Sequence, residues 1–160
     1  MTGARNLTTR SSLLAVALAV LATSSTIAIA ASPAAPVIEK RQANYKKMGA
    51  ALKTLKDQLS GGSPSRSELQ AAANSLAATA KLQPKLFPAG SGPGSGVKTD
   101  ALPNIWTDRA AFDTAMSELI TESGKLAAIA GNGSTAQIQA QYRAVGKTCG
   151  GCHRQFRADD

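Results

Sequence analysis

The chain has 160 residues and a formal net charge of +8, with two cysteines and one histidine. This length suits one compact domain and is too short for two. The positive charges are scattered, and Tyr45, Trp106 and Tyr142 lie on apolar helix faces rather than in a basic stripe, which argues against nucleic-acid binding. We expect the excess charge to steer the protein towards acidic partners or an anionic surface.

Residues 1–30 have the features of a secretory signal peptide. Two arginines form a basic start, residues 13–22 are apolar, and residues 28–30 fit the small-x-small cleavage pattern. The apolar core is shorter than the ~20 residues that a spanning helix needs, which favours cleavage over the alternative of an uncleaved N-terminal anchor. Cleavage would leave residues 31–160 as one domain with a net charge of +6, because the signal contains two arginines and no acidic residue. No other segment is expected to span a membrane.

The rest of the chain is predicted to be all-α, since alanine is abundant, strand-forming residues are few and no stretch alternates apolar with polar residues. The first helix is expected from about Ala35 to Leu59, and residues 61–64 end it. Residues at steps of three and four form one stripe along this helix. They are Ile38, Arg41, Tyr45, Met48, Leu52, Leu55 and Leu59.

A second helix is predicted after Ser65, which forms a capping box with Glu68. Its apolar face consists of small and aliphatic residues, namely Leu69, Ala72, Ala73, Leu76 and Ala80. Pro84 and Pro88 stop the helix. Residues 89–102 are rich in Gly, Ser and Pro and are predicted to form a mobile loop.

The third helix is predicted to run from Pro103 to Ala130, and residues 131–133 form a tight turn. Ser134 and Gln137 make a capping box for a fourth helix, whose stripe again follows steps of three and four. The stripe consists of Ile138, Tyr142, Val145, Cys149, Cys152 and Phe156. Four amphipathic helices joined mostly by short connections predict an antiparallel up-down four-helix bundle.

The strongest motif in the chain is Cys149-Gly150-Gly151-Cys152-His153. On a helix, the two thiols and the imidazole can all meet one flat ligand, because the three residues share one face. Each thiol can add to a haem vinyl group, and the adjacent imidazole is then held against the iron as its proximal ligand. The pattern is the attachment signature of a covalent haem c, and we predict one such haem.

Three other interpretations of the two cysteines remain open. A thiol–disulfide redox pair would usually begin a helix after a strand, whereas this motif lies near the end of the last helix of an all-α chain. A zinc site would need four ligands, so a carboxylate such as Asp159 or Asp160 would have to complete it. A structural disulfide is permitted in an exported chain but gives His153 no role.

Three segments carry a resemblance to a known family: RQANYKKM at residues 41–48, LPNIWTD at 102–108 and CGGCHRQFR at 149–157. They resemble the opening helix, the start of the third helix and the haem-binding end of the cytochromes c′, the high-spin class II c-type cytochromes. That family also places the haem motif near the C-terminus of a four-helix bundle. The resemblance spans roughly residues 36–157.

The sixth ligand of the iron can be narrowed down by elimination. His153 is the only histidine, which leaves Met48, Met116, a lysine, a tyrosinate or no residue. In low-spin members of the family the methionine ligand lies four residues after the arginine of the first helix, and Tyr45 occupies that position here. A phenol with a pKa near 10 is a poor ligand. We therefore expect a five-coordinate, high-spin haem with Tyr45 as bulk on its distal side. The alternatives are a low-spin haem with Met48 as ligand, and Tyr45 as an ordinary core aromatic.

Three more residues are expected near the haem. Arg41 occupies a position that apolar residues otherwise fill, and a haem propionate would pair with its guanidinium, as the resemblance also implies. The alternative is a side chain that reaches solvent at the end of the bundle. Arg157, one turn after His153, is expected to flank the proximal face or to be a cation favoured by the helix dipole. Trp106 is expected at the haem edge or in the core.

The resemblance implies a periplasmic haem protein that binds nitric oxide and carbon monoxide, disfavours dioxygen and passes single electrons to a redox partner of unknown identity. We expect no enzymatic activity, since no catalytic acid–base pair or nucleophile set stands out. The alternatives are a low-spin electron carrier and a thiol–disulfide oxidoreductase. The resemblance also implies a homodimer through the first two helices, which small residues along 71–80 allow.

Overall fold

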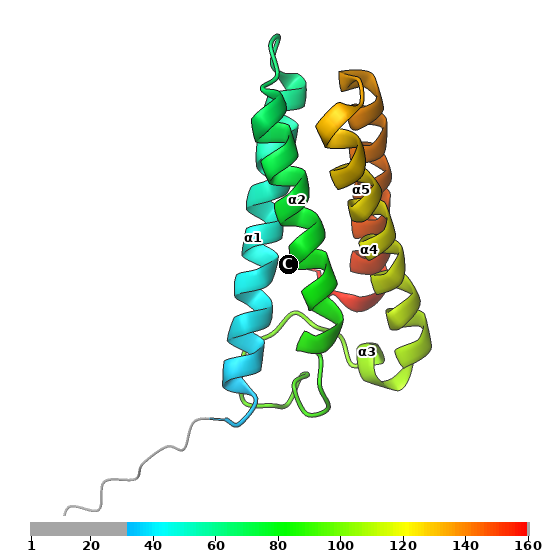
Figure 1. Cartoon of the computed structure of the whole chain (residues 1–160). Coiled ribbons are helices and arrows are strands. Elements are labelled where there is room, and N and C mark those ends of the chain that lie inside the picture. The colour runs from blue at the N-terminus through cyan, green and yellow to red at the C-terminus, as the bar shows by residue number, and fades with distance from the viewer. Residues whose placement is uncertain (1–31, 160) are drawn as a thin grey trace, which may run out of the picture. The chain divides into compact units, whose positions relative to one another are not determined.

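Four long helices make up most of residues 32–159, the part of the chain that this computed structural model describes (Figure 1). They are α1 (Ala35–Ser60), α2 (Arg66–Leu82), α4 (Arg109–Asn132) and α5 (Thr135–Phe156). A 3₁₀ turn, η1 (Gln83–Leu86), follows α2, and a single helical turn, α3 (Asn104–Thr107), precedes α4. The predicted all-α four-helix bundle is confirmed. The predicted signal peptide lies outside the described residues, and within them no helix has the length and apolar character needed to cross a bilayer.

The four long helices pack in chain order around the bundle. α1 lies along α2, α2 along α4 and α4 along α5, whereas α1 and α5 share few contacts. Figure 1 shows α1 and α2 as one pair and α4 and α5 as a second pair. The side of the bundle between the first and last helices is therefore its least closed side.

The third predicted helix is interrupted, which the sequence analysis did not anticipate. The backbone leaves the helical conformation at Asp108, with φ −122° and ψ 62°, and the Asp108 carboxylate accepts a hydrogen bond from the backbone N–H of Ala111 at 3.3 Å. Asp108 is thus the N-cap of α4, because a short acidic side chain satisfies an amide that a helix start leaves unpaired. The helix predicted from Pro103 is instead one turn, α3, followed by a separate helix, α4, that extends to Asn132.

The two predicted capping boxes have different outcomes. At the start of α5, Ser134 and Gln137 bond each other's backbone amides reciprocally, as predicted. At the start of α2, Ser65 Oγ accepts from the Glu68 amide at 3.4 Å, but the Ser65 amide donates to Gln58 Oε1 at 2.7 Å. The second half of that box was wrong, because a side chain from the last turn of α1 reaches the Ser65 amide and so ties α1 to α2 across the turn.

The core consists of two clusters of buried side chains. The larger cluster joins all four long helices and is mainly aliphatic, with Met48, Leu55, Leu76, Leu126 and Val145 among its members. The smaller cluster is rich in aromatic rings and lies at the loop end of the bundle; it contains Leu86, Phe87, Ile105, Phe112, Met116 and Phe156. Within it the Phe112 ring packs edge-on against Phe87 and Phe156, at centroid distances of 4.8 and 5.3 Å.

The C-terminal end of α5 is fixed to the segment that precedes α3. The Leu102 amide donates to the Phe156 carbonyl at 3.0 Å, and the Ala158 amide donates to the Asp100 carbonyl at 2.8 Å. The Asn104 side chain adds a hydrogen bond to the Gln155 carbonyl at 2.7 Å. The last turns of α5, which carry the cysteine motif, are therefore held by backbone bonds as well as by packing.

Candidate haem-attachment site

The two cysteines lie on the inner side of the last two turns of α5. Both are half-buried, and they pack on different parts of the core: Cys149 against the larger cluster and Cys152 against the smaller one. Burial raises the pKa of the Cys149 thiol and raises that of Cys152 to about 11. Thiol–disulfide oxidoreductases lower the pKa of the attacking cysteine, so this environment is unlike that of a redox-active pair.

His153 follows the second cysteine and has an exposed side chain. Partial desolvation, and secondly the charge of Arg157, lower the pKa of the imidazole. The neutral ring is the form that ligates a metal, so this shift favours the state that the motif requires. Within the described residues no group of three or more His, Cys, Asp or Glu side chains is placed to hold a metal ion, and Asp160, one of the carboxylates considered for a zinc site, lies outside them.

Tyr45 reaches this region from α1. The half-buried Tyr45 ring packs against both core clusters, whereas Cys149 packs against the larger cluster and Cys152 against the smaller one. Burial is the main cause of a strongly raised pKa for the phenol, and the neighbouring Cys152 and Cys149 thiols raise it further while Arg41 lowers it. The structure therefore brings Tyr45 together with Cys149 and Cys152, and Arg41 lies close to Tyr45 on the same helix.

Two glycines line the same side of the bundle. Gly49 lies one turn after Tyr45 on α1, and Gly146 lies one turn before Cys149 on α5. A Cβ atom added at either glycine would meet no other atom within 4 Å. Together with the few contacts between α1 and α5, the glycines leave room on this side for a flat group joined to the two thiols.

Arg41 is buried, with a relative exposure of 2%, so it does not extend to solvent as one interpretation of the sequence suggested. Its two terminal nitrogens donate to the Leu86 carbonyl, to the hydroxyl and carbonyl of Ser91 and to the Thr99 hydroxyl, at 2.9 to 3.3 Å. The guanidinium also lies 4.5 Å from the centroid of the Phe87 ring. Arg41 thus holds the loop that follows α2, a function that the sequence analysis did not foresee.

The comparisons with known proteins agree with this geometry. The family model of cytochrome c′ matches residues 36–157. A cytochrome c′ of Rhodospirillum rubrum is 35% identical over 153 residues, which cover 92% of this chain and 97% of that protein. The chain belongs to the cytochrome c′ family.

Two solved cytochrome c′ structures show the same fold. One, a cytochrome c′ with an unusual ligand-controlled dimer dissociation, has a TM-score of 0.74 and 28% identity and covers 81% of this chain and 100% of its own. The other is the nitric oxide complex of a variant from Alcaligenes xylosoxidans, with a TM-score of 0.70 and 25% identity, covering 79% of this chain and 97% of its own. Covalent haem c is the cofactor of the cytochrome c′ family, so the predicted cofactor is confirmed.

The residues between α1 and α5 fit such a group. A haem tethered at Cys149 and Cys152 would contact the aliphatic and the aromatic cluster at once, because each thiol lies against one of them. Arg41 has no carboxylate partner among the ion pairs of the described residues, although its charge is buried. A buried cation without an anion is costly, and the charge of a haem propionate would relieve that cost. The four terminal N–H groups of Arg41 already donate to the loop, so the Nε–H is the donor left for a propionate.

Met48, the alternative axial ligand, is directed elsewhere. It is 5% exposed and belongs to the larger cluster of the core. The Gln83 side-chain amide donates to the Met48 sulfur at 3.4 Å. Met116 lies in the aromatic cluster and is 2% exposed.

Trp106 and Arg157 lie around this site in different ways. The Trp106 indole donates to the Pro88 carbonyl at 2.9 Å and packs against Phe87, so its described contacts are with the loop after α2 rather than with the cysteine motif. Arg157 lies close enough to His153 to lower the pKa of the imidazole and forms an ion pair with Asp100 at 3.8 Å. A role for either residue at the haem remains a prediction.

The contact between Trp106 and the loop gives a stability prediction. A Cβ atom at Gly92 would lie 2.7 Å from the Trp106 ring, which is held by its hydrogen bond to Pro88. We expect Gly92→Ala to lower the free energy of unfolding by about 1–3 kcal/mol, as overpacking does in buried sites. Gly62→Ala is the control, since a Cβ there meets nothing within 4 Å, and it should change stability by less than about 0.5 kcal/mol. Urea titrations of both variants test this, and equal stabilities would contradict it.

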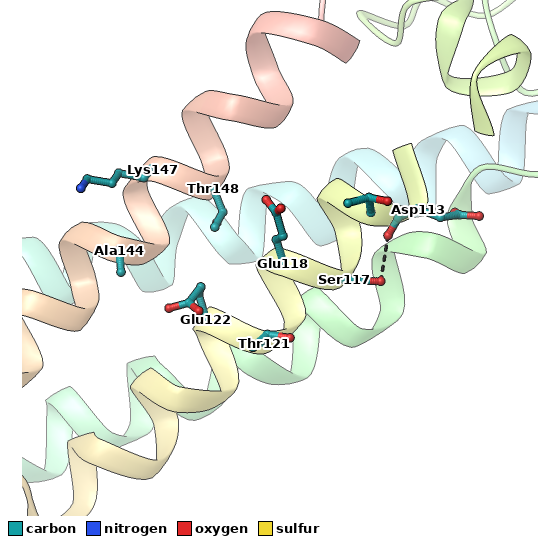
Figure 2. A pocket seen from close by; sticks show the side chains of 9 residues that line it. Asp113, Ser117, Glu118, Thr121, Glu122, Ala144, Lys147 and Thr148 are labelled. Atoms are coloured by element: carbon teal, nitrogen blue, oxygen red, sulfur yellow. Dashed lines mark hydrogen bonds between the residues drawn. The ribbon is translucent and has the colours of Figure 1, made fainter. Parts of the chain in front are cut away.

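A separate groove of about 720 Å³ lies between α4 and α5 (Figure 2). Asp113, Glu118 and Glu122 of α4 line it, and Figure 2 shows Lys147 of α5 directed away from it. The groove was not predicted from the sequence, and its carboxylates belong to a chain that is basic overall. None of the predicted haem-site residues lines it.

Proposed function

We propose that this cytochrome c′ is an exported periplasmic protein that holds one haem between α1 and α5, binds small diatomic gases at a five-coordinate, high-spin iron and passes single electrons. In this proposal Cys149 and Cys152 form the two thioether bonds, and His153 is the iron ligand. The observation that carries it is the packing of Tyr45 against the same core clusters as the two thiols, combined with a Met48 sulfur that already accepts a hydrogen bond from Gln83.

The haem supplies a redox-active iron with a coordination position open to gases. The chain supplies the surroundings of that iron. The thiols and the imidazole come from one helix whose end is bonded to the segment before α3, so the fold holds their relative positions. Arg41 supplies a buried positive charge for a propionate while it holds the loop after α2.

Tyr45 is assigned to the distal side, where it excludes water and controls access by its bulk. Burial and the nearby thiols raise the pKa of its phenol, so the ring stays neutral at physiological pH and is a poor ligand. A neutral phenol also offers at most one hydrogen-bond donor to a gas, which is consistent with weak stabilisation of dioxygen.

The relatives support the gas-binding part of the proposal. The structure from Alcaligenes xylosoxidans contains nitric oxide, and the fold it shares with this protein covers 79% of the present chain. The relative with ligand-controlled dimer dissociation supports the further proposal that this chain forms a homodimer through α1 and α2. The small residues of α2 that face outward from the core allow a second copy to approach closely.

The absorption spectrum of the ferrous protein tests the coordination state. We expect a high-spin spectrum without added ligand and a sharp change when carbon monoxide is added. A sharp low-spin spectrum before any ligand is added would overturn the five-coordinate assignment, and a colourless protein with two titratable thiols would overturn the haem assignment altogether.

Removal of the Tyr45 ring should open the distal side. We expect Tyr45→Ala to raise the rate constant for carbon monoxide binding by about tenfold, which corresponds to a barrier lower by about 1.4 kcal/mol. Tyr45→Phe is the matched control, because it keeps the ring and removes only the hydroxyl, and its rate should stay close to that of the wild type. Flash photolysis or stopped-flow mixing measures both rates. If Tyr45→Phe accelerates binding as much as Tyr45→Ala, steric control by the ring is refuted.

A further inference from the structure

The charged side chains of this protein are distributed unevenly over the bundle. α1 contains six cationic and two anionic residues, and α5 contains three cationic residues and no acidic one. α4, by contrast, contains two cationic and three acidic residues, and its acids line the groove on the α4 side of α5 (Figure 2). Positive charge is thus concentrated on the two helices that border the least closed side of the bundle.

The lysines of α1 can be assigned to flanks from the contacts of their neighbours. Asn44 donates to the Thr79 carbonyl of α2 at 2.9 Å, so this flank of α1 faces α2. Tyr45 marks the flank that faces α5, because its ring packs against the same two core clusters as Cys149 and Cys152 of α5. Lys56 is exposed and lies eleven residues after Tyr45, about three helical turns, so the helical repeat places it on the α5 side. Lys46 is also exposed; it is rotated by about 100° from Tyr45, away from Asn44, and so lies at the outer edge of that flank.

The facing flank of α5 is also basic. The Gln141 side chain donates to the Glu122 carboxylate at 2.6 Å, which assigns that flank of α5 to α4. Arg143 and Gly146 are exposed and lie on the opposite flank, towards α1. Gly146 and Gly49 thus form a low region between the two helices. We call the four cationic side chains around it the basic rim; they are Lys46, Lys53, Lys56 and Arg143.

Most of this positive charge is not neutralised within the protein. Lys53 pairs with Asp57 on the same helix, with both side chains more than half exposed, and such surface pairs contribute little. Lys46, Lys56 and Arg143 take part in none of the ion pairs found among residues 32–159. Their charge is therefore available to an incoming partner.

We propose that the basic rim between α1 and α5 is the docking surface for an acidic electron-transfer protein. The inference rests on the proposed function, because the docking surface lies on the side of the bundle where the haem is proposed to be held. Complementary charge raises association rates and orients the partner, and the low region at the two glycines lets a protein surface approach the cofactor.

The rim fits a protein partner better than a membrane or a second copy. Membrane-surface helices combine basic residues with large apolar side chains that insert into the lipid. The exposed large hydrophobic residue among residues 32–159 is Leu82, which lies on α2 and not at the rim. A symmetric dimer through the rim would place like charges opposite each other, which is unfavourable.

Two charge reversals on the same helix separate this proposal from a general effect of net charge. Lys46→Glu/Lys56→Glu changes the rim. Lys40→Glu/Lys47→Glu is the control, because it makes the same change in charge on the flank of α1 that carries Asn44. These two exposed lysines lie four residues before and three residues after Asn44. The probe is a flavodoxin, an acidic electron-transfer protein, and surface plasmon resonance measures its Kd for each holoprotein at low and high salt.

We expect the rim variant to raise the Kd at low salt by about tenfold or more, the control to raise it by less than about threefold, and the difference to vanish at high salt. Equal effects of the two variants would overturn the proposal, as would the absence of binding by the wild type. Rim-dependent binding to phosphatidylserine vesicles without binding to flavodoxin would assign the surface to a membrane instead. The absorption spectra of the same samples test the proposed haem centre separately, because the Kd measurement does not depend on the spin state.

Discussion

Replacement of Arg41 by leucine is expected to lower the free energy of unfolding by about 3 kcal/mol. The variant loses four hydrogen bonds and the contact with Phe87, and it leaves the carbonyls of Leu86 and Ser91 without the donor that satisfies them. Relief from burying a charge offsets part of the loss, since burial lowers the pKa of Arg41 and so works against its charged form. Urea denaturation followed by circular dichroism measures the difference.

Arg109→Leu is the matched control for this prediction. Arg109 also donates to a loop carbonyl, that of Phe87, at 3.1 Å, and its guanidinium lies 5.6 Å from the centroid of a phenylalanine ring, Phe112. Its side chain, however, is 42% exposed, so water replaces most of what the substitution removes. We expect a loss below about 1 kcal/mol. Equal losses in the two variants would show that burial of Arg41 has no special role in holding the loop.

Met48→Ala is expected to cost about 2–5 kcal/mol of stability and to leave the ferrous spectrum unchanged. The loss follows from the cavity left among the aliphatic side chains of the core, where Met48 is 5% exposed. The unchanged spectrum follows from the direction of its sulfur, which accepts a hydrogen bond from Gln83. Urea titration and absorption spectroscopy on the same preparation measure the two quantities.

Met48→Leu separates packing from ligation if the alanine variant is too unstable to purify. Leucine keeps most of the volume, so the stability should fall by less than about 1.5 kcal/mol. Leucine cannot ligate iron, so the spectrum of this variant alone decides the question. A shift from a low-spin to a high-spin spectrum in Met48→Leu would make Met48 an axial ligand and would refute the five-coordinate assignment.

The fold was predictable from the sequence because local signals and the hydrophobic pattern agree. Steps of three and four in the apolar residues located α1, α2 and α5, and the capping residues Ser65 and Ser134 fixed two helix starts. The break at Asp108 was missed because the apolar pattern continues through it, from Ile105 to Phe112. The available signal was the acidic side chain itself, since Asp favours the N-cap over a helix interior.

The residues that attach the haem were predictable from the sequence, whereas the contacts of the residues around them were less so. The cysteine motif is a local pattern, so the two thiols and the imidazole could be found from five consecutive residues. The partners of Arg41 could not, because Ser91 and Thr99 come from an irregular loop whose path has no sequence period. The open side between α1 and α5 is likewise a property of helix packing, which periodicity within one helix does not determine.

The position of Tyr45 opposite the cysteines has a consequence for biosynthesis. The residues that meet there come from the first and last helices of the bundle, since Tyr45 is on α1 and the thiols are on α5. The two sides of the pocket are thus 104 residues apart in sequence (149 − 45), and the pocket can form only after the chain has been made through to α5. Its formation depends on a contact between distant parts of the chain, which closes more slowly than the local contacts within each helix pair.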